Sequence, residues 1–215
     1  MNDLREMLAG YLGHRLTLEN VWAANGSNEV MTHVLGAFAG PGRTVLSFGP
    51  TYSMYPEYAR NTHTEYVTAP LRVDYTLDAS DILLAVARVE PTVVVITTPN
   101  NPTGLLPDNR LLREIALRCE RLGINLILDE AFIDFIAGEP GFIPLLRDNP
   151  HIWVLRSLTK FYAIPGLRLG YLVNSNEQAV VQMRSRQMPW SINAFAALAG
   201  EIILRDSAYQ RATWK

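Results

Sequence analysis

Residues 157–168 read SLTKFYAIPGLR, and they separate two short apolar runs, Ile152–Leu155 and Leu169–Val173. Both runs have the length and the flanking residues of β-strands. The stretch is therefore predicted to form a loop between two strands. It places one lysine, Lys160, among hydroxyl side chains, with an arginine, Arg168, eight residues further on.

The residue types in this loop suit one kind of chemistry. A partly buried lysine with a lowered pKa can attack an aldehyde as a nucleophile. Ser157, Thr159 and Arg168 offer two hydroxyl donors and a bidentate cation, which are groups that bind phosphate. Pyridoxal phosphate is an aldehyde that carries a phosphate, so the loop predicts a site for this cofactor. Taken alone, the loop also fits a surface lysine and arginine beside an ordinary turn.

Composition limits the function classes. The chain has 215 residues, 48% of them hydrophobic, which is enough for one large or two small domains. Its formal net charge of -2 argues against a nucleic-acid partner, which would need a basic surface. No apolar stretch reaches the roughly 18 residues of a membrane helix, and the mixed-charge start has no signal-peptide pattern. We therefore expect a cytoplasmic protein with no membrane partner.

Cysteine and histidine usage gives no sign of a disulfide or a metal site. The single cysteine, Cys119, excludes an internal disulfide and fits a reducing compartment. It lies within a helical pattern and is predicted to be an inert core thiol. The four histidines show no metal-ligand spacing with it.

Strand and helix patterns alternate along the whole chain. Besides the two runs that flank the loop, strands are predicted over residues 21–24, 43–48, 64–68, 92–97 and 125–128. Helices are predicted over residues 4–12, 111–122, 176–187 and 193–204, with others that end near residues 39 and 88 and one that includes residues 54–58. This alternation predicts an α/β fold, a three-layer sandwich with a mostly parallel sheet between helices. No G-x-G-x-x-G follows the first strand, which argues against a dinucleotide site.

Five candidate residues follow strand ends: Asn28, Tyr52, Asn101, Asp129 and Ser157. In open α/β sheets ligands bind at the carboxyl ends of strands, so these turns are predicted to form one site.

Each turn also has an individual interpretation. The helix that starts at Ser27 or Asn28, either of which could cap it, has free amides that attract anions. Tyr52 could present its ring to a flat cofactor or pack in the core. Asp129 ends a buried strand, where an ionised carboxylate is costly unless it is paired. A protonated pyridine nitrogen, one of the chain's own arginines or a helix end would satisfy it.

Three motifs together are highly specific. They are Asn-Pro-Thr-Gly at 101–104, Asp-Glu-Ala at 129–131, and Ser157-x-x-Lys160 with Arg168. With them, essentially the whole chain resembles the fold-type I pyridoxal-phosphate enzymes of aminotransferase class I/II.

The resemblance implies a role for each site residue. Lys160 would form the Schiff base with the cofactor and act as the catalytic residue, and Asp129 would pair with the pyridine nitrogen. Asn101 would bond to the phenolic oxygen, and Tyr52 would stack on the ring. The groups that would hold the phosphate are Ser157, Arg168 and the backbone around Asn28 and Glu29.

Within the family, two likenesses coexist. The part up to Ile96 is similar to actinobacterial histidinol-phosphate aminotransferases. The part from Asn100 on is more similar to the threonine-phosphate decarboxylases of cobalamin biosynthesis. Phe132 stands where aminotransferases usually carry tyrosine, and phenylalanine cannot donate a hydrogen bond to the cofactor, which favours the decarboxylase.

The resemblance therefore implies decarboxylation of L-threonine O-3-phosphate to aminopropanol phosphate, with histidinol-phosphate transamination as the alternative. The substrate would be a small phosphorylated amino acid or amino alcohol, and the enzyme a homodimer. Residues 1–215 would form the cofactor-binding large domain, short at both ends and without the small C-terminal domain. The chain could also bind the cofactor without being active, or form the effector-sensing part of a transcription regulator.

Overall fold

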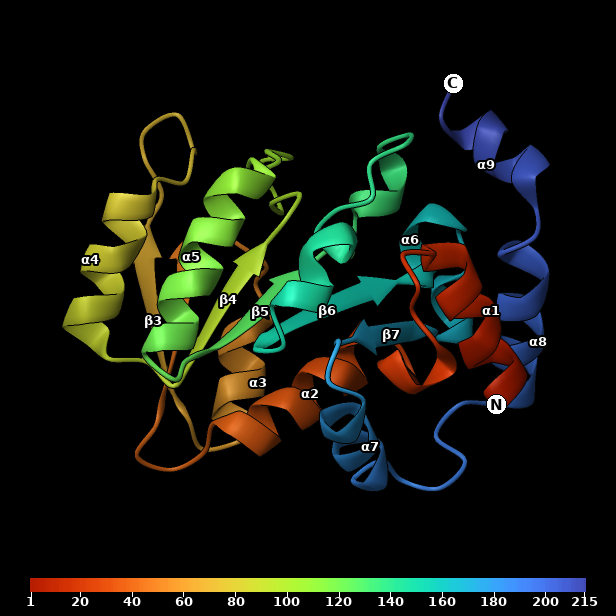
Figure 1. The fold of residues 1–215 in the computed structure, drawn as a ribbon, viewed down its shortest axis with the longest axis horizontal. Helices are drawn as coiled ribbons and strands as arrows, with labels where there is room; N and C mark the ends of the chain where they lie inside the picture. The colour runs from red at the N-terminus through yellow and green to blue at the C-terminus, as the bar shows by residue number, and fades with distance from the viewer.

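A computed structural model describes all 215 residues, and helices cover both faces of one central sheet (Figure 1). The sheet has seven strands: β1 (Val21–Ala24), β2 (Thr44–Gly49), β3 (Glu65–Pro70), β4 (Val93–Thr97), β5 (Asn125–Asp129), β6 (Ile152–Ser157) and β7 (Gly170–Val173). Their order is β1-β7-β6-β5-β4-β2-β3. The mostly parallel sheet and the three-layer α/β architecture predicted from the sequence are confirmed.

Only β7 runs against the others, and it pairs antiparallel with both β1 and β6. The other pairs, β2–β3, β2–β4, β4–β5 and β5–β6, are parallel. Because β7 separates β1 from β6, these two strands point the same way. The turn after β1 therefore lies at the same edge of the sheet as the turns after β4, β5 and β6.

The α-helices are α1 (Asn2–Leu12), α2 (Ser27–Phe38), α3 (Tyr55–Asn61), α4 (Ala79–Val89), α5 (Asn109–Arg121), α6 (Leu158–Phe161), α7 (Glu177–Ser185), α8 (Ala194–Ile203) and α9 (Ser207–Thr213). Four 3₁₀ segments join them: η1 (Leu18–Asn20), η2 (Ile133–Phe135), η3 (Ile143–Asp148) and η4 (Pro165–Leu167). The sequence patterns missed α6, α9 and the four 3₁₀ segments, which are too short to show an apolar periodicity. The stretch between β6 and β7 is therefore not only a loop, as predicted, because it contains α6 and η4. No helix has the length and apolar character needed to cross a membrane.

Two apolar layers enclose the sheet. Helices α1, α4, α5 and α8 contribute to a cluster of 33 buried residues on one face. Helices α2, α3 and α7 contribute to a cluster of 18 on the other. Neighbouring residues of β5 divide between them, with Ile127 in the second cluster and Leu126 and Leu128 in the first. This is the alternation of a strand that is buried on both sides.

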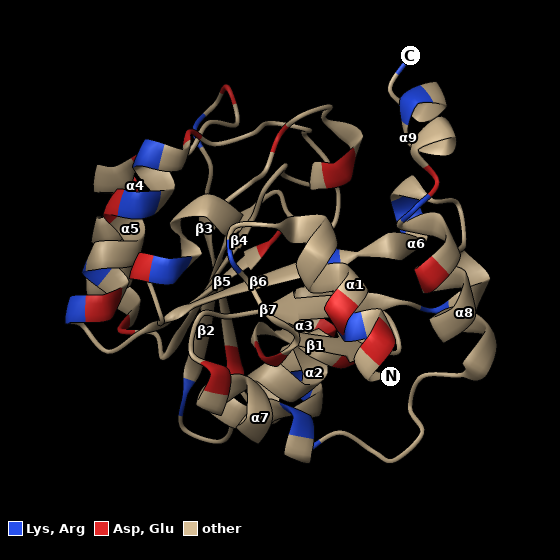
Figure 2. Ribbon diagram, turned by 45° about the vertical axis from the view of Figure 1, so that its right-hand side comes forward, with Lys and Arg blue, Asp and Glu red and all other residues tan.

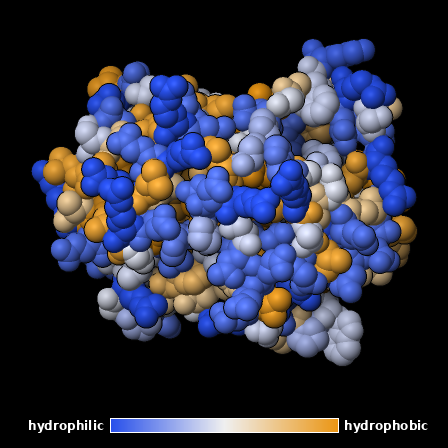
Figure 3. All heavy atoms as spheres, viewed as in Figure 1, coloured by the Kyte–Doolittle hydropathy of each residue, from blue (hydrophilic) through white to orange (hydrophobic).

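Charged residues lie mainly on the outer helices and loops (Figure 2). On the face seen in Figure 3, hydrophobic residues are scattered among hydrophilic ones. Charged groups inside the fold are few. Arg5 of α1 is buried against the Val21 carbonyl, and three others gather at the carboxyl ends of β5 and β6, where Asp129, Glu130 and Arg156 are each at most 5% exposed. That edge therefore holds a cluster of buried charges.

Candidate cofactor site

Strand alternation directs the candidate side chains to one face of this edge. Asp129 stands two residues after Ile127, and Ser157 two residues after Leu155. Both of these apolar residues belong to the cluster beneath α2 and α3. Asp129 and Ser157 therefore continue the same face, and the site forms where α2 and α3 meet the sheet.

Lys160 lies in α6, the short helix that follows β6 directly. Its Nζ donates to Ser157 Oγ at 3.2 Å, and Ser157 Oγ also bonds Thr159 Oγ1 at 2.8 Å. Burial lowers the pKa of Lys160, the Asp129 carboxylate acts in the opposite sense, and Arg168 lowers the pKa further. The amine, the acid and the guanidinium thus interact electrostatically, and the lysine is biased towards its neutral, nucleophilic form.

Asp129 is held by neutral donors. Tyr55 donates its hydroxyl hydrogen to Asp129 Oδ2 at 2.7 Å, and the Ala131 N–H donates to Oδ1 at 3.1 Å. No lysine or arginine of the chain forms a salt bridge with this carboxylate, although it is only 5% exposed. Burial raises its pKa, and the two hydrogen bonds partly oppose that shift. Among the alternatives raised by the sequence, an ion pair with one of the chain's arginines is therefore wrong.

The backbone of residues 26–29 at the start of α2 lies against the side chain of Arg168, and together they form a concave site that we call the cradle. The helix has Gly26 as its N-cap, with a φ of 82° and no side-chain cap, so the prediction that Ser27 or Asn28 caps it is wrong. A Cβ on Gly26 would lie 2.7 Å from Arg168 Nη2, which means that the guanidinium rests against the bare backbone. A Cβ on Gly170 would lie 2.4 Å from the Ser27 nitrogen. Only glycine fits at these two contacts.

This cradle fits a phosphate. The uncapped amides at the start of α2 attract anions, and the arginine adds a fixed cation beside them. Arg168 is held there by a left-handed backbone with φ 58° and by a 3.0 Å bond from Nη1 to the Pro165 carbonyl. Glu29 points its carboxylate back to the Asn25 N–H, away from the role of a phosphate ligand. Its expected contribution is therefore through the backbone only.

Tyr52 follows β2 and Asn101 follows β4, at the edge of the sheet where β5 and β6 also end. The Tyr52 ring meets the Tyr55 ring edge to face, with centroids 5.4 Å apart. Asn101 and Phe132 line the same groove, and the Phe132 ring centroid lies 5.8 Å from Lys160 Nζ. The structure thus places all the predicted residues at one edge of the sheet.

The hydroxyl groups behind Asp129 were not predicted from the sequence. Tyr55 OH bonds Thr97 Oγ1 at 2.7 Å as well as Asp129, and Thr97 Oγ1 bonds Thr51 Oγ1 at 2.9 Å. The only signals were that Tyr55 falls about one helical turn after Tyr52 and that Thr97 ends β4. Neither signal distinguishes a site residue from an ordinary core or strand position.

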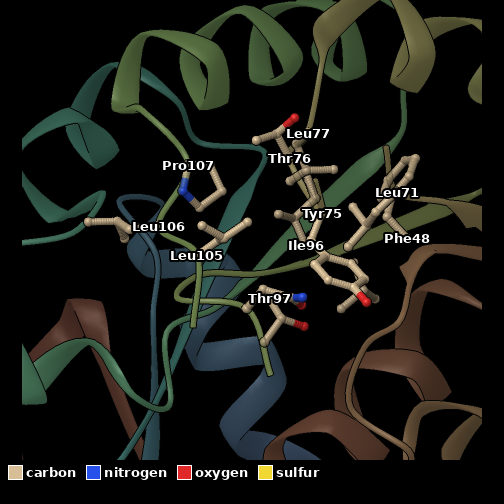
Figure 4. A pocket seen from close by; sticks show the side chains of 12 residues that line it. Phe48, Leu71, Tyr75, Thr76, Leu77, Ile96, Thr97, Leu105, Leu106 and Pro107 are labelled. Atoms are coloured by element: carbon tan, nitrogen blue, oxygen red, sulfur yellow. The ribbon is translucent and has the colours of Figure 1, made fainter. Parts of the chain in front are cut away.

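A second hollow lies beside the site (Figure 4). It is mostly apolar, with Phe48, Leu71, Ile96 and Leu105 in its wall, and Thr97 is the residue it shares with the hydroxyl chain. It contains none of the charged groups of the cradle. No group of three or more His, Cys, Asp or Glu side chains could hold a metal ion, and Cys119 is buried with its pKa raised by burial to about 12.

Residues 1–213 match the family of aminotransferase class I and II. The chain belongs to this family, whose members are pyridoxal-phosphate-dependent enzymes.

Among relatives, the chain is 51% identical over 201 residues to the threonine-phosphate decarboxylase of Salmonella typhimurium, covering 94% of this chain and 55% of that protein. It is 39% identical to the histidinol-phosphate aminotransferase of Bifidobacterium longum, covering 92% and 54%. The chain thus spans about half the length of the curated relatives it matches. The likeness to the decarboxylase is not confined to the part after Asn100.

Solved structures share the fold. The histidinol-phosphate aminotransferase from Clostridium acetobutylicum superposes with a TM-score of 0.88 at 27% identity, over 99% of this chain and 61% of that one. The histidinol-phosphate aminotransferase from Sinorhizobium meliloti, solved in complex with pyridoxal-5'-phosphate, gives 0.86 at 22% identity, over 99% and 57%. The single sheet with its two helical layers corresponds to the large domain of these enzymes.

Proposed function

We propose that residues 1–215 are the cofactor-binding large domain of a pyridoxal-phosphate enzyme that decarboxylates L-threonine O-3-phosphate to aminopropanol phosphate. The observation that carries the proposal is the meeting of Lys160, Asp129 and Arg168 at one sheet edge. The decarboxylase is favoured over other reactions of the family by the 51% identical relative and by Phe132 beside the lysine.

The cofactor, when bound, supplies an aldehyde for the amine and a ring that accepts the electrons released when a bond at the substrate α-carbon breaks. Each residue would have one task around it. Asp129 would hold the protonated pyridine nitrogen, and Asn101 would donate to the phenolic oxygen. The ring of Tyr52 would stack on the cofactor. Arg168, Ser157 and the amides of Asn28 and Glu29 would hold the phosphate.

Lys160 performs the proton transfers. Its lowered pKa leaves more neutral amine at physiological pH than an ordinary lysine has, so Nζ can attack the aldehyde. Ser157 Oγ accepts from Nζ and fixes its direction. Nζ would take a proton from the ammonium group of the incoming substrate and would donate it to the α-carbon once carbon dioxide has left. In a transamination the same atom would instead remove a proton from that carbon as general base.

The alternative is histidinol-phosphate transamination, which is favoured by the 39% identical relatives. Histidinol phosphate has no carboxylate and cannot be decarboxylated, whereas threonine phosphate carries both a carboxylate and an α-hydrogen, so the products formed from it identify the reaction. Incubation with threonine phosphate should yield carbon dioxide and aminopropanol phosphate, whereas histidinol phosphate should leave the visible absorbance of the cofactor unchanged. The reverse pattern would establish the aminotransferase.

The second alternative is a chain that binds the cofactor but has no activity, because the relatives are nearly twice as long. A stable visible absorbance without turnover of either substrate would establish it. We further propose a cytoplasmic homodimer that acts on a small phosphorylated amino acid or amino alcohol. Light scattering of the purified chain, with and without pyridoxal phosphate, tests the dimer.

A further inference from the structure

A buried ion pair lies directly behind the cofactor site, and the proposed reaction leaves it without a task. Asp129 and Glu130 are consecutive, as are Arg156 and Ser157. Because strand residues alternate between faces, Glu130 and Arg156 point to the face opposite the site. Their side chains are 1% and 4% exposed.

The pair satisfies its polar atoms almost completely. Arg156 donates to Glu130 Oε2 from Nε at 2.9 Å and from Nη2 at 2.8 Å. Nη2 also donates to the Pro140 carbonyl at 2.6 Å, and Glu130 Oε1 accepts from the Phe142 N–H at 2.7 Å. Burial acts to lower the pKa of Arg156, but Glu130, Tyr171 and Asp134 together outweigh it and the pKa is raised. The arginine is therefore a permanent cation in this position.

The surrounding loop is shaped to this pair. Gly141 has a φ of 62°, and a Cβ there would lie 2.5 Å from both carboxylate oxygens of Glu130. Asp134, 7% exposed, stands 3.8 Å from Arg156 Nη1 and accepts from Tyr11 at 3.2 Å. The loop after β5, through Asp134 and Gly141, and helix α1, through Tyr11, thus both pack around the ion pair.

The pair also lies where the backbone hydrogen bonds between β5 and β6 end. The register between β5 and β6 ends at Asp129 and Leu155, and the last backbone bond is from the Glu130 N–H to the Leu155 carbonyl, at 2.8 Å. Beyond this point the Glu130–Arg156 side-chain pair ties the two chain segments together. Asp129 and Ser157, with Lys160 three residues later, stand at or just past the end of the ladder.

We propose that Glu130 and Arg156 are positioning residues, which hold the ends of β5 and β6 at the separation that aims Asp129 and Lys160 at the same bound cofactor. This inference rests on the proposed function of Lys160 and Asp129. The pair carries no net charge, so its effect on the site is geometric rather than electrostatic.

The test is the double variant Glu130→Met/Arg156→Met, which removes the link between the two strand ends without changing net charge. Asp134 loses the cation beside it but keeps its hydrogen bond from Tyr11. Replacing a buried ion pair by apolar residues of similar volume is often neutral for stability, so this chain should fold. The dissociation constant for pyridoxal phosphate, measured by titrating the visible absorbance, should rise about tenfold or more. Arg156→Lys keeps the positive charge but cannot donate two hydrogen bonds to Glu130 as the planar guanidinium does. Its dissociation constant should therefore lie between those of the parent and the double variant.

A matched control separates positioning from stability. Val86→Ala truncates a buried side chain near the end of α4, which leads to the amino end of β4, opposite the edge that carries the site, and its denaturation midpoint can be compared with that of the double variant. The control should bind the cofactor like the parent chain. The positioning role is overturned if the double variant also binds with the parent's dissociation constant. Failure of the parent chain itself to show the absorbance would instead overturn the proposed function.

Discussion

Two neighbouring carboxylates at the end of β5 are both buried but are satisfied in different ways. Glu130 meets an arginine fork and a backbone amide, whereas Asp129 meets a tyrosine hydroxyl and a backbone amide. A buried carboxylate is costly unless a cation or several donors hold it. The chain provides Glu130 with a salt bridge and Asp129 with none, a difference that supports the proposed role of Asp129 in receiving a cation from a ligand.

The largest effect is expected at the amine that faces Asp129. Lys160→Ala removes the only amine at the site, so turnover and the visible absorbance of the bound cofactor should both be lost. Circular dichroism should remain that of the parent, because Lys160 is only partly buried. A variant that kept the absorbance would place the cofactor on another residue.

The stability contrast between the two acids comes next. Glu130→Ala leaves Arg156 buried without its partner and should lower the free energy of unfolding by about 3–5 kcal/mol. Asp129→Asn breaks no salt bridge, so its free energy of unfolding at neutral pH should stay close to that of the parent or exceed it. Its affinity for the cofactor should fall. Urea denaturation of both variants checks this. Equal losses would remove the contrast.

The pH dependence of Asp129→Asn and the parent sharpens the comparison. The pKa of Asp129 is raised by burial above its ordinary value of 3.8, so the folded chain holds the proton at pH values where the unfolded chain has released it. The buried carboxyl therefore lowers stability increasingly as pH rises above about 4. The stability of Asp129→Asn relative to the parent should grow with pH over this range. A constant difference would show that the carboxyl titrates normally.

Tyr55 is expected to have a moderate effect. Tyr55→Phe removes the hydroxyl that bonds both Asp129 and Thr97, and the loss of these buried hydrogen bonds should lower the free energy of unfolding by about 1–3 kcal/mol. It should also raise the pKa of Asp129 further, because the bond from Tyr55 favours the ionised form. Denaturation measures the first effect, and Tyr66→Phe on β3, which loses the bond between its hydroxyl and Ser47, is the control for a tyrosine hydroxyl that does not contact Asp129.

The smallest effect is a shift in the titration of Lys160. Its pKa lies below the ordinary 10.5 because of burial, Asp129 opposes this shift, and Arg168 adds to it. Acetylation of the cofactor-free chain at increasing pH, followed by mass spectrometry, should therefore give a midpoint below 10.5. Asp129→Asn should move the midpoint down and Arg168→Met should move it up. Shifts in the opposite directions would show that the three groups do not share a site.

Local sequence patterns were enough to predict the strands and the edge that carries the site. Apolar runs such as residues 92–97 predicted the strands, and the position of Asp129, Ser157 and Lys160 after strands predicted the edge. The antiparallel direction of β7 had no local signal, because direction follows from pairing partners. Tyr55 was missed because its contact with Asp129 joins segments 74 residues apart. The Glu130–Arg156 pair was missed for the same reason, since only strand pairing brings the two residues together.

The most direct measurement is to reduce the chain with borohydride in the presence of pyridoxal phosphate and to map the label by trypsin digestion. Trypsin cuts after Arg156 and Arg168 and, in the unlabelled chain, also after Lys160. We predict a single labelled peptide over residues 157–168, left uncut at Lys160 and lost in Lys160→Ala. A label on any other amine, or none at all, would contradict the central claim that Lys160 carries the cofactor.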